Sequence, residues 1–144
     1  MRTMADHNAG IIEQFRANKG RVGGYFEGAT MLLLHTAGRK TGLPRVNPLV
    51  YLPDGDRFVV FATKSGAPTN PHWYHNLKAN RDVEVEVGTE TIPVRAREIQ
   101  EEDERAQLYA RQVERRPDFG EYPKHTSRRI PVIALERARG DGPA

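Results

Sequence analysis

Three cationic side chains gather around one turn of this chain of 144 residues. Arg39, Lys40 and Arg45 lie in the segment GRKTGLPR, where Gly38 and Gly42 predict a turn. Guanidinium and ammonium groups at this spacing can hold a phosphodiester or several carboxylates through charge-assisted hydrogen bonds. A solvated basic turn has the same composition, so the spacing alone leaves both interpretations open.

A second candidate anion site is the polar loop that follows an apolar run. Its residues are Thr63, Lys64, Ser65 and Gly66. They offer hydroxyl and backbone N–H donors at the expected end of a strand, where ligands often bind. Asn70 and Pro71 then predict a helix start, because Asn caps exposed amides and Pro suits the first helical position. A helix N-terminus beside small residues suits an anion, although polar surface loops are common.

Aromatic and acid–base side chains form the third candidate group. Trp73, the single tryptophan, can pack on a planar ligand or lie in the core. Tyr122 and His125 precede the last apolar run, where they can donate protons or only make surface hydrogen bonds. Phe119, Tyr122 and His125 are spaced by three, so a short helical turn would place them on one face that can cover a planar substrate.

Other residue types narrow the chemistry. The absence of cysteine excludes disulfides, thiolate nucleophiles and Cys-ligated metal sites. His72 and His75 have a spacing that can ligate metal, but no acidic partner lies nearby in the sequence, and we predict no metal site. The net charge of +3 and the pI near 9.4 permit an anionic partner without requiring nucleic acid.

Hydrophobic periodicity predicts the elements that position these side chains. Strands are expected at residues 30–36, 48–52, 58–62, 82–87, 90–99 and 130–135. The segment from Pro53 to Asp56 predicts a hairpin turn. Helices are expected over residues 8–19, 71–80 and 101–115. About six mostly antiparallel strands with about three packed helices indicate a mainly β (α+β) fold, a small barrel with helices outside.

The organisation of the chain is expected to be simple. We predict one domain over residues 11–136, a flexible N-terminus over 1–10 and a flexible tail over 137–144. The apolar face of the first helix, which carries Ile11 and Phe15, can cover the core, lie on a membrane surface or border a cofactor channel. The sequence shows no span long enough to cross a bilayer, so we expect a cytoplasmic protein with at most weak membrane-surface association, as a monomer or a dimer.

Several blocks in combination resemble the deazaflavin-dependent nitroreductase family, which includes quinone reductases that use reduced coenzyme F-420. These blocks are GRKTGLPRVNP at 38–48, TKSGAPTNPHWYHNLKAN at 63–80 and TSRRIPVIALE at 126–136. The resemblance extends over residues 11–136. It implies a split β-barrel, similar to the flavin-binding split barrels, with the 8-hydroxy-5-deazaflavin ring in a groove.

The resemblance also implies roles for individual residues. Arg39, Lys40 and Arg45 match the family's positions for the phosphate and the polyglutamate tail of the coenzyme. The remaining coenzyme contacts that it implies are Asn47, Pro48, Thr63, Lys64, Ser65, Gly66, Ala67, Trp73 and Asn76. A reduced deazaflavin donates two electrons at once, so the protein need only align its ring with an acceptor and exclude water. The implied acceptors are quinones, activated enones and nitroaromatics.

The acceptor pocket is implied along residues 116–125, where relatives carry aromatic side chains that close over the substrate. In this sequence the segment offers Arg116, Phe119 and Tyr122 as pocket residues. Tyr122 is the candidate that donates a hydrogen bond or a proton to the acceptor oxygen, and His125 is the second candidate. Only Tyr122 keeps a phenol, which leaves nitro reduction and the source of the proton open.

Three other functions compete with this interpretation. An FMN-dependent oxidoreductase of the same barrel type would bind one phosphate and would not need all three cations. A single-stranded nucleic-acid module would use Trp73, Tyr74 and Phe58 as stacking surfaces. A coenzyme carrier would bind F-420 without turnover.

Overall fold

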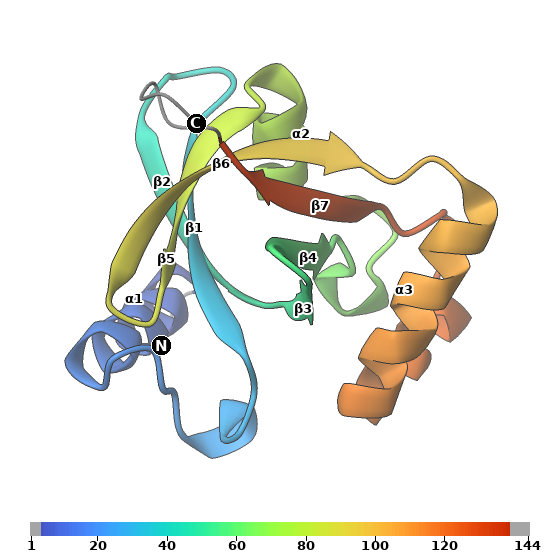
Figure 1. Cartoon of the computed structure of the whole chain (residues 1–144), viewed down its shortest axis with the longest axis horizontal. Coiled ribbons are helices and arrows are strands. Elements are labelled where there is room, and N and C mark those ends of the chain that lie inside the picture. Colours follow the sequence, from blue (N-terminus) through green and yellow to red (C-terminus); the bar gives the residue numbers. More distant parts are fainter. Residues whose placement is uncertain (1–3, 139–144) are drawn as a thin grey trace.

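Seven antiparallel strands form one sheet in the computed structural model, which describes residues 4–138 (Figure 1). The strands are β1 (Met31–Ala37), β2 (Pro44–Val50), β3 (Leu52–Asp54), β4 (Arg57–Phe61), β5 (Asp82–Val87), β6 (Glu90–Glu98) and β7 (Val132–Arg137). The α-helices are α1 (Met4–Ala17), α2 (His72–Ala79) and α3 (Glu102–Arg115). Short 3-10 helices are η1 (Gly24–Phe26), η2 (Lys64–Gly66), η3 (Pro117–Gly120) and η4 (Tyr122–His125). The predicted mainly β fold with packed helices is confirmed.

The strand order explains why the sheet curls. The order is β2-β1-β5-β6-β7-β4-β3, so β2 and β3 lie at opposite edges. Only Tyr51 separates them in the chain, and two Cα–Cα steps span at most about 7.6 Å. The two edges must therefore approach each other, which gives the sheet its barrel shape.

Residues 48–52 were predicted to form one strand, but they are divided between β2 and β3, because the chain changes partners at Tyr51. Up to Val50 the chain pairs with β1, and from Leu52 it pairs with β4. The Tyr51 N–H donates to the Thr30 carbonyl at 2.9 Å. The predicted hairpin turn is confirmed, since Asp54 pairs with Arg57 across Gly55.

Alternating apolar side chains bury both faces of β1, β4 and β7. On the inner face, the first of three clusters includes Leu32, Leu34, Phe58, Val60, Ile133 and Leu135 together with Trp73, Tyr74 and Leu77 of α2. On the outer face, Val59, Phe61, Val132 and Ala134 pack under α3, and Met31 and Leu33 pack under α1. Because successive strand residues point to opposite faces, an unbroken apolar run serves two clusters at once.

Helix α1 covers the outer face at β1 and β2. It begins at Met4, before the predicted Asn8 cap, so it includes part of the N-terminal segment that was expected to be flexible. Ile11 and Phe15 are buried, at 7% and 1% exposure, and an ion pair from Arg16 to Glu86 ties the helix to β5. These apolar side chains therefore face the sheet and not a lipid surface.

The division into one domain with flexible ends remains a prediction, since residues 1–3 and 139–144 lie outside the described part. Among the described helices, none is long and apolar enough to cross a bilayer.

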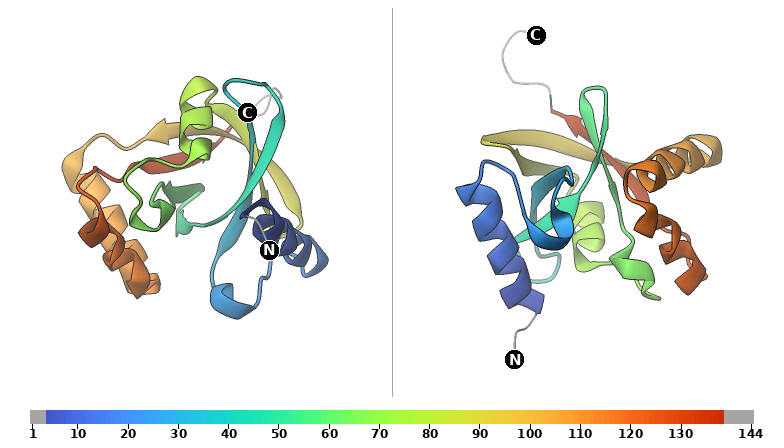
Figure 2. Two further views of the ribbon diagram at one scale, coloured as in Figure 1. Left: turned by 180° about the vertical axis from the view of Figure 1, so that it is seen from behind. Right: turned by 90° about the horizontal axis from the view of Figure 1, so that it is seen from below.

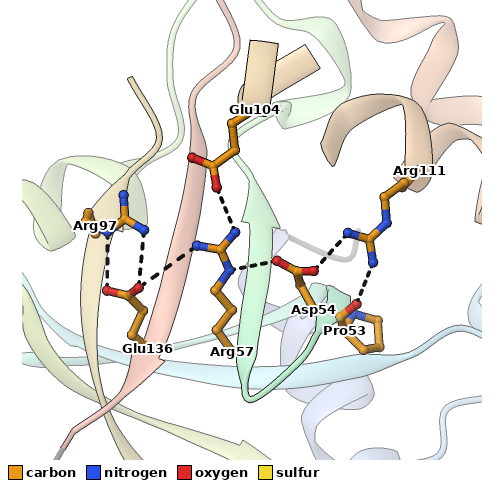
Figure 3. Close-up of polar contacts among 7 residues, drawn as sticks. All are labelled: Pro53, Asp54, Arg57, Arg97, Glu104, Arg111 and Glu136. Atoms are coloured by element: carbon orange, nitrogen blue, oxygen red, sulfur yellow. Dashed lines mark hydrogen bonds and ion pairs between the residues drawn. The ribbon is translucent and has the colours of Figure 1, made fainter. Parts of the chain in front are cut away.

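Helix α3 is fastened to the β3–β4 hairpin by a network of charges (Figure 3). Asp54 accepts hydrogen bonds from Arg57 at 2.8 Å and from Arg111 of α3 at 2.9 Å. Arg57 also donates to Glu104 of α3 at 3.0 Å. Because the pKa of Asp54 is lowered by its hydrogen bonds to Arg111 and Arg57, the carboxylate stays charged and keeps both arginines in place. The network thus fixes the helix that leads into the segment from Arg116 to Tyr122.

Candidate active site

A cavity of about 860 Å³ lies between α1 and the chain that follows α3. One wall is α1 with the Gly23–Phe26 segment, and the opposite wall is the chain after α3. Figure 2 shows α1 and α3 on opposite sides of the barrel, each on the outer face of the curled sheet. The floor comes from β2, the end of β4, η2 and the start of α2. The volume lies within the range of pockets that hold a cofactor or a drug-sized ligand, and most of the lining is apolar.

The cavity brings together most of the side chains that the sequence singled out. Its lining includes Asn47, Pro48, Thr63, Lys64, Ser65, Trp73, Arg116, Phe119 and Tyr122. The predicted residues outside the lining are Arg39, Lys40, Arg45, Gly66, Ala67, Asn76 and His125. Residues implied to bind the coenzyme and residues implied to bind the acceptor therefore border one space.

The loop from Thr63 to Gly66 has an unusual backbone. Lys64, Ser65 and Gly66 all have positive φ values, of 46°, 54° and 79°. Non-glycine residues adopt this region rarely, and it persists only where the surroundings impose it. Lys64 and Ser65 are exposed along the cavity, whereas Thr63 is buried at its edge.

Arg128 imposes this conformation. Its guanidinium donates to the carbonyls of Ala62, Thr63 and Ala67 at 3.0, 2.6 and 2.8 Å, and to the Asn70 side-chain oxygen at 2.7 Å. These acceptors are neutral, and burial lowers the pKa of Arg128. Its fork of donors therefore works as a brace for the loop.

The basic turn lies beside α2, next to the cavity. The Asn76 side chain, buried in α2, accepts from the Arg39 N–H at 3.1 Å and donates to the Thr36 hydroxyl at 3.1 Å. Asn76 therefore holds the turn in position. Arg39, Lys40 and Arg45 themselves are exposed, so their side chains are accessible to an anion that extends out of the cavity.

The wall of the cavity after α3 consists of Arg116 and residues of the 3-10 helices η3 and η4, and we call it the acceptor wall because its residues are those implied to bind the acceptor. Phe119 is buried, and its ring centroid lies 5.2 Å from that of Tyr122. The Tyr122 hydroxyl donates to Asp118 at 3.2 Å, and the Tyr109 hydroxyl fixes the Phe119 carbonyl at 2.7 Å. The wall therefore combines two aromatic rings with the charged side chains of Arg116 and Asp118, and the Asp118 carboxylate accepts the hydrogen bond of the Tyr122 hydroxyl.

His125 does not line the cavity, whereas Phe119 and Tyr122 do. It is exposed, and its Cβ faces Gly66 rather than the cavity. A Cβ built on Gly66 would lie 2.8 Å from the Tyr122 carbonyl oxygen and 2.9 Å from the Cβ of His125. Only glycine lets η2 approach η4 this closely, so the two loops that border the cavity are packed directly against each other.

Sequence reasoning missed the α1 wall. His7, Asn8, Ile11 and Gln14 line the cavity, and Gln14 accepts from the Gly23 N–H at 3.3 Å. The sequence analysis named Ile11 on this helix but not the polar residues His7, Asn8 and Gln14, and its cofactor-channel interpretation stays a prediction. The polar residues lie at helical spacing from Ile11, which is the signal that could have identified them. Asp118 was also missed, although it lies four residues before Tyr122, a spacing at which side chains on successive helical turns can meet.

The aromatic side chains of the nucleic-acid hypothesis are buried. Trp73, Tyr74 and Phe58, the stacking set of the nucleic-acid hypothesis, are each less than 10% exposed, and only Trp73 borders the cavity. Within residues 4–138, no group of three His, Asp or Glu side chains could hold a metal ion.

Comparison with known proteins identifies relatives that match most of the chain. Residues 10–137 match the family described as F420H(2)-dependent quinone reductase. The chain is 44% identical over 126 residues to an F420H(2)-dependent quinone reductase of Mycobacterium tuberculosis, with 85% of each chain covered.

Solved structures agree with this match. A structure titled F420-H2 Dependent Reductase (FDR-A) is 37% identical with a TM-score of 0.67, over 74% of this chain and 94% of the other. A structure titled domain-swapped dimer is 32% identical with a TM-score of 0.69, over 92% and 96%. The fold is the split β-barrel of these reductases, as expected.

Proposed function

We propose that this chain, which belongs to the F420H(2)-dependent quinone reductase family, transfers hydride from reduced coenzyme F-420 to a quinone within the cavity. The observation that carries the proposal is that residues implied to bind the coenzyme and residues implied to bind the acceptor line one cavity. The loop at Thr63–Ser65 and Trp73 border the same cavity as Phe119 and Tyr122. Activated enones and nitroaromatics are further candidate acceptors.

The residues present fit the coenzyme. A planar ring suits the apolar side chains of Val50, Phe61 and Trp73, which line the floor of the cavity. The exposed cations of the basic turn suit the phosphate and the carboxylates of the tail. Lys64 and Ser65 add donors in the lining of the cavity. The coenzyme, when bound, supplies a two-electron hydride donor.

The protein's own part is to orient the acceptor and exclude water. Phe119 and Tyr122 present two neighbouring rings, tilted by 58° to each other, on one wall, and these aromatic faces and edges suit a planar acceptor in the cavity. The polar groups of that wall are Arg116, Asp118 and the Tyr122 hydroxyl, and of these Arg116 and the hydroxyl can stabilise the negative charge that grows on the acceptor oxygen. To donate to an acceptor, the Tyr122 hydroxyl must exchange its hydrogen bond to Asp118 for one to the acceptor oxygen.

Membrane association is proposed to be weak at most. Quinones partition into lipid, but Ile11 and Phe15 are buried against the sheet and offer no free apolar face there. Any attraction to an anionic membrane would then come from the exposed cations and would be sensitive to salt.

The test is an anaerobic turnover assay with a soluble quinone and either reduced F-420 or reduced FMN. We expect saturable, enzyme-dependent reoxidation of F-420 and little enzyme-dependent reoxidation of FMN. Equal turnover with FMN would favour the FMN-dependent alternative. Tight binding of F-420 without turnover of any quinone, enone or nitroaromatic would favour a coenzyme carrier.

A further inference from the structure

Basic side chains continue from the cavity along the exposed side of α2. His72 lines the large cavity, and Lys78 lines a second cavity of about 330 Å³. His75 lies between them at helical spacing of three residues from each. A helix rises about 1.5 Å per residue, so His72 and Lys78 are about 9 Å apart along the axis. The exposed side of α2 therefore connects the two cavities.

The cations along this path have no acidic partner. Arg39, Lys40, Arg45, Lys78 and Arg81 make no ion pair within 4.0 Å in the described part of the chain. Elsewhere arginines are commonly paired, as Arg57, Arg95 and Arg97 are. Unpaired like charges repel each other, so their concentration in one region favours an external anion.

Positively charged side chains near His75 affect its pKa. Its pKa is lowered first by burial and then by the charges of Arg39, His72 and Lys78. The hydrogen bond from the Arg39 N–H to Asn76 also places the basic turn directly against α2. The turn and the far end of the helix thus contribute to one electrostatic surface.

The second cavity has features that suit a carboxylate chain at Lys78 and Arg81. Arg97 and Glu98 also line it. Arg97 is held by Glu136 at 3.3 Å, and Glu98 accepts from the Tyr74 hydroxyl at 2.6 Å. The Lys78 ammonium lies 5.5 Å from the Tyr74 ring centroid, which orients it without neutralising it. Lys78 and Arg81 are therefore the cations that remain available.

We propose that Lys78 and Arg81 bind the distal carboxylates of the coenzyme's polyglutamate tail, beyond those held at Arg39, Lys40 and Arg45. We call Lys78 and Arg81 the distal tail site. This inference rests on the proposed function and adds to it a dependence on tail length. Each additional glutamate brings one carboxylate along the exposed side of α2, and the gain is electrostatic and decreases with salt.

The test compares defined tail lengths. Binding of F-420 with one glutamate and with five is titrated at low salt against the wild type and the double variant Lys78→Ala/Arg81→Ala. Exposed ion pairs contribute modestly, so we expect the wild type to bind the longer form roughly three- to tenfold more tightly. The double variant should lose most of that preference and keep its affinity for the one-glutamate form.

A matched control removes the same charge elsewhere. Lys19 and Arg21 are exposed, and neither has an ion pair among the described residues. The control is Lys19→Asn/Arg21→Ala, because Asn tolerates the φ of 57° at Lys19. It should keep the preference for the longer tail.

Each outcome decides between the two proposals. Equal affinity of the wild type for both forms, or an unchanged preference in the Lys78→Ala/Arg81→Ala variant, would overturn the distal tail site and leave the proposed function standing. Loss of the preference in the control as well would show a non-specific charge effect and would also overturn the site. Failure of the wild type to bind either form would overturn both proposals.

Discussion

Replacing Gly66 by alanine should loosen the packing between the two loops that border the cavity. Gly66 has a φ of 79°, and an added Cβ would meet the Tyr122 carbonyl oxygen at 2.8 Å. The left-handed conformation costs an L-residue about 1–2 kcal/mol. Forcing apart packed backbone and side-chain atoms adds about 1–3 kcal/mol. The variant should therefore lose about 2–5 kcal/mol of folding free energy.

Gly28 provides the control for this variant. It has the same φ of 79°, but nothing lies within 4 Å of its added Cβ. Gly28→Ala should therefore lose only the conformational part, about 1–2 kcal/mol. The effect of alanine on the unfolded chain is the same at both positions and cancels in the comparison.

Thermal unfolding and steady-state kinetics measure the difference. At about 3 °C per kcal/mol, Gly66→Ala should lower Tm by roughly 6–15 °C and Gly28→Ala by roughly 3–6 °C. Because η4 begins at Tyr122, kcat/KM for the acceptor should also fall in Gly66→Ala and not in the control. Equal losses of Tm and unaltered acceptor kinetics would refute the argument that η2 positions η4.

Three further predictions address single groups. Tyr122→Phe should lower kcat/KM for quinones about 100-fold, because a positioned acid contributes about that much, and should leave coenzyme affinity nearly unchanged. Unaltered kcat/KM across several acceptors would show that solvent supplies the proton. Arg128→Lys keeps the charge but loses the fork of donors to the loop, so KM for F-420 should rise more than kcat falls, and an unchanged KM would remove the bracing role. The pKa of Asp54 is lowered in the folded state, so its stabilising contribution is present above the unfolded value of about 3.9 and is lost as pH falls through the folded value. Asp54→Asn should therefore flatten the acid side of the Tm profile, and a profile parallel to that of the wild type would contradict this.

Local sequence patterns were sufficient for most elements. The turn at Gly55 and the helix ending at Arg115 depend on neighbouring residues, and both lie where expected. The break at Tyr51 does not follow from its neighbours, because the apolar run continues through it. It is decided by pairing with Thr30 on one side and with β4 on the other. Such partners become known only when the sheet has formed.

Site residues could be predicted where a chemically suitable side chain lies in a segment that resembles the family. Trp73 and Tyr122 belong to segments with recognisable composition, and both border the cavity. His7 lies outside these segments, and its approach to the cavity depends on how α1 packs. Asp118 lies within residues 116–125, but its contact with the Tyr122 hydroxyl was not foreseen. His125 has the spacing from Tyr122 that a shared face requires. In the structure, however, its Cβ packs against Gly66, and the residue is exposed and does not line the cavity. Spacing alone therefore could not distinguish these positions.

The fluorescence of Trp73 tests the central claim most directly. It is the only tryptophan of the chain, and it lines the cavity. Titration with oxidised F-420 should quench its emission saturably, and FMN should do so only at higher concentration because it offers one phosphate to a turn with three cations. A quinone added to the complex should change the emission again if both molecules share the cavity. Quenching by FMN at the same or lower concentration, or the absence of saturable quenching by F-420, would contradict the assignment of this cavity to the deazaflavin.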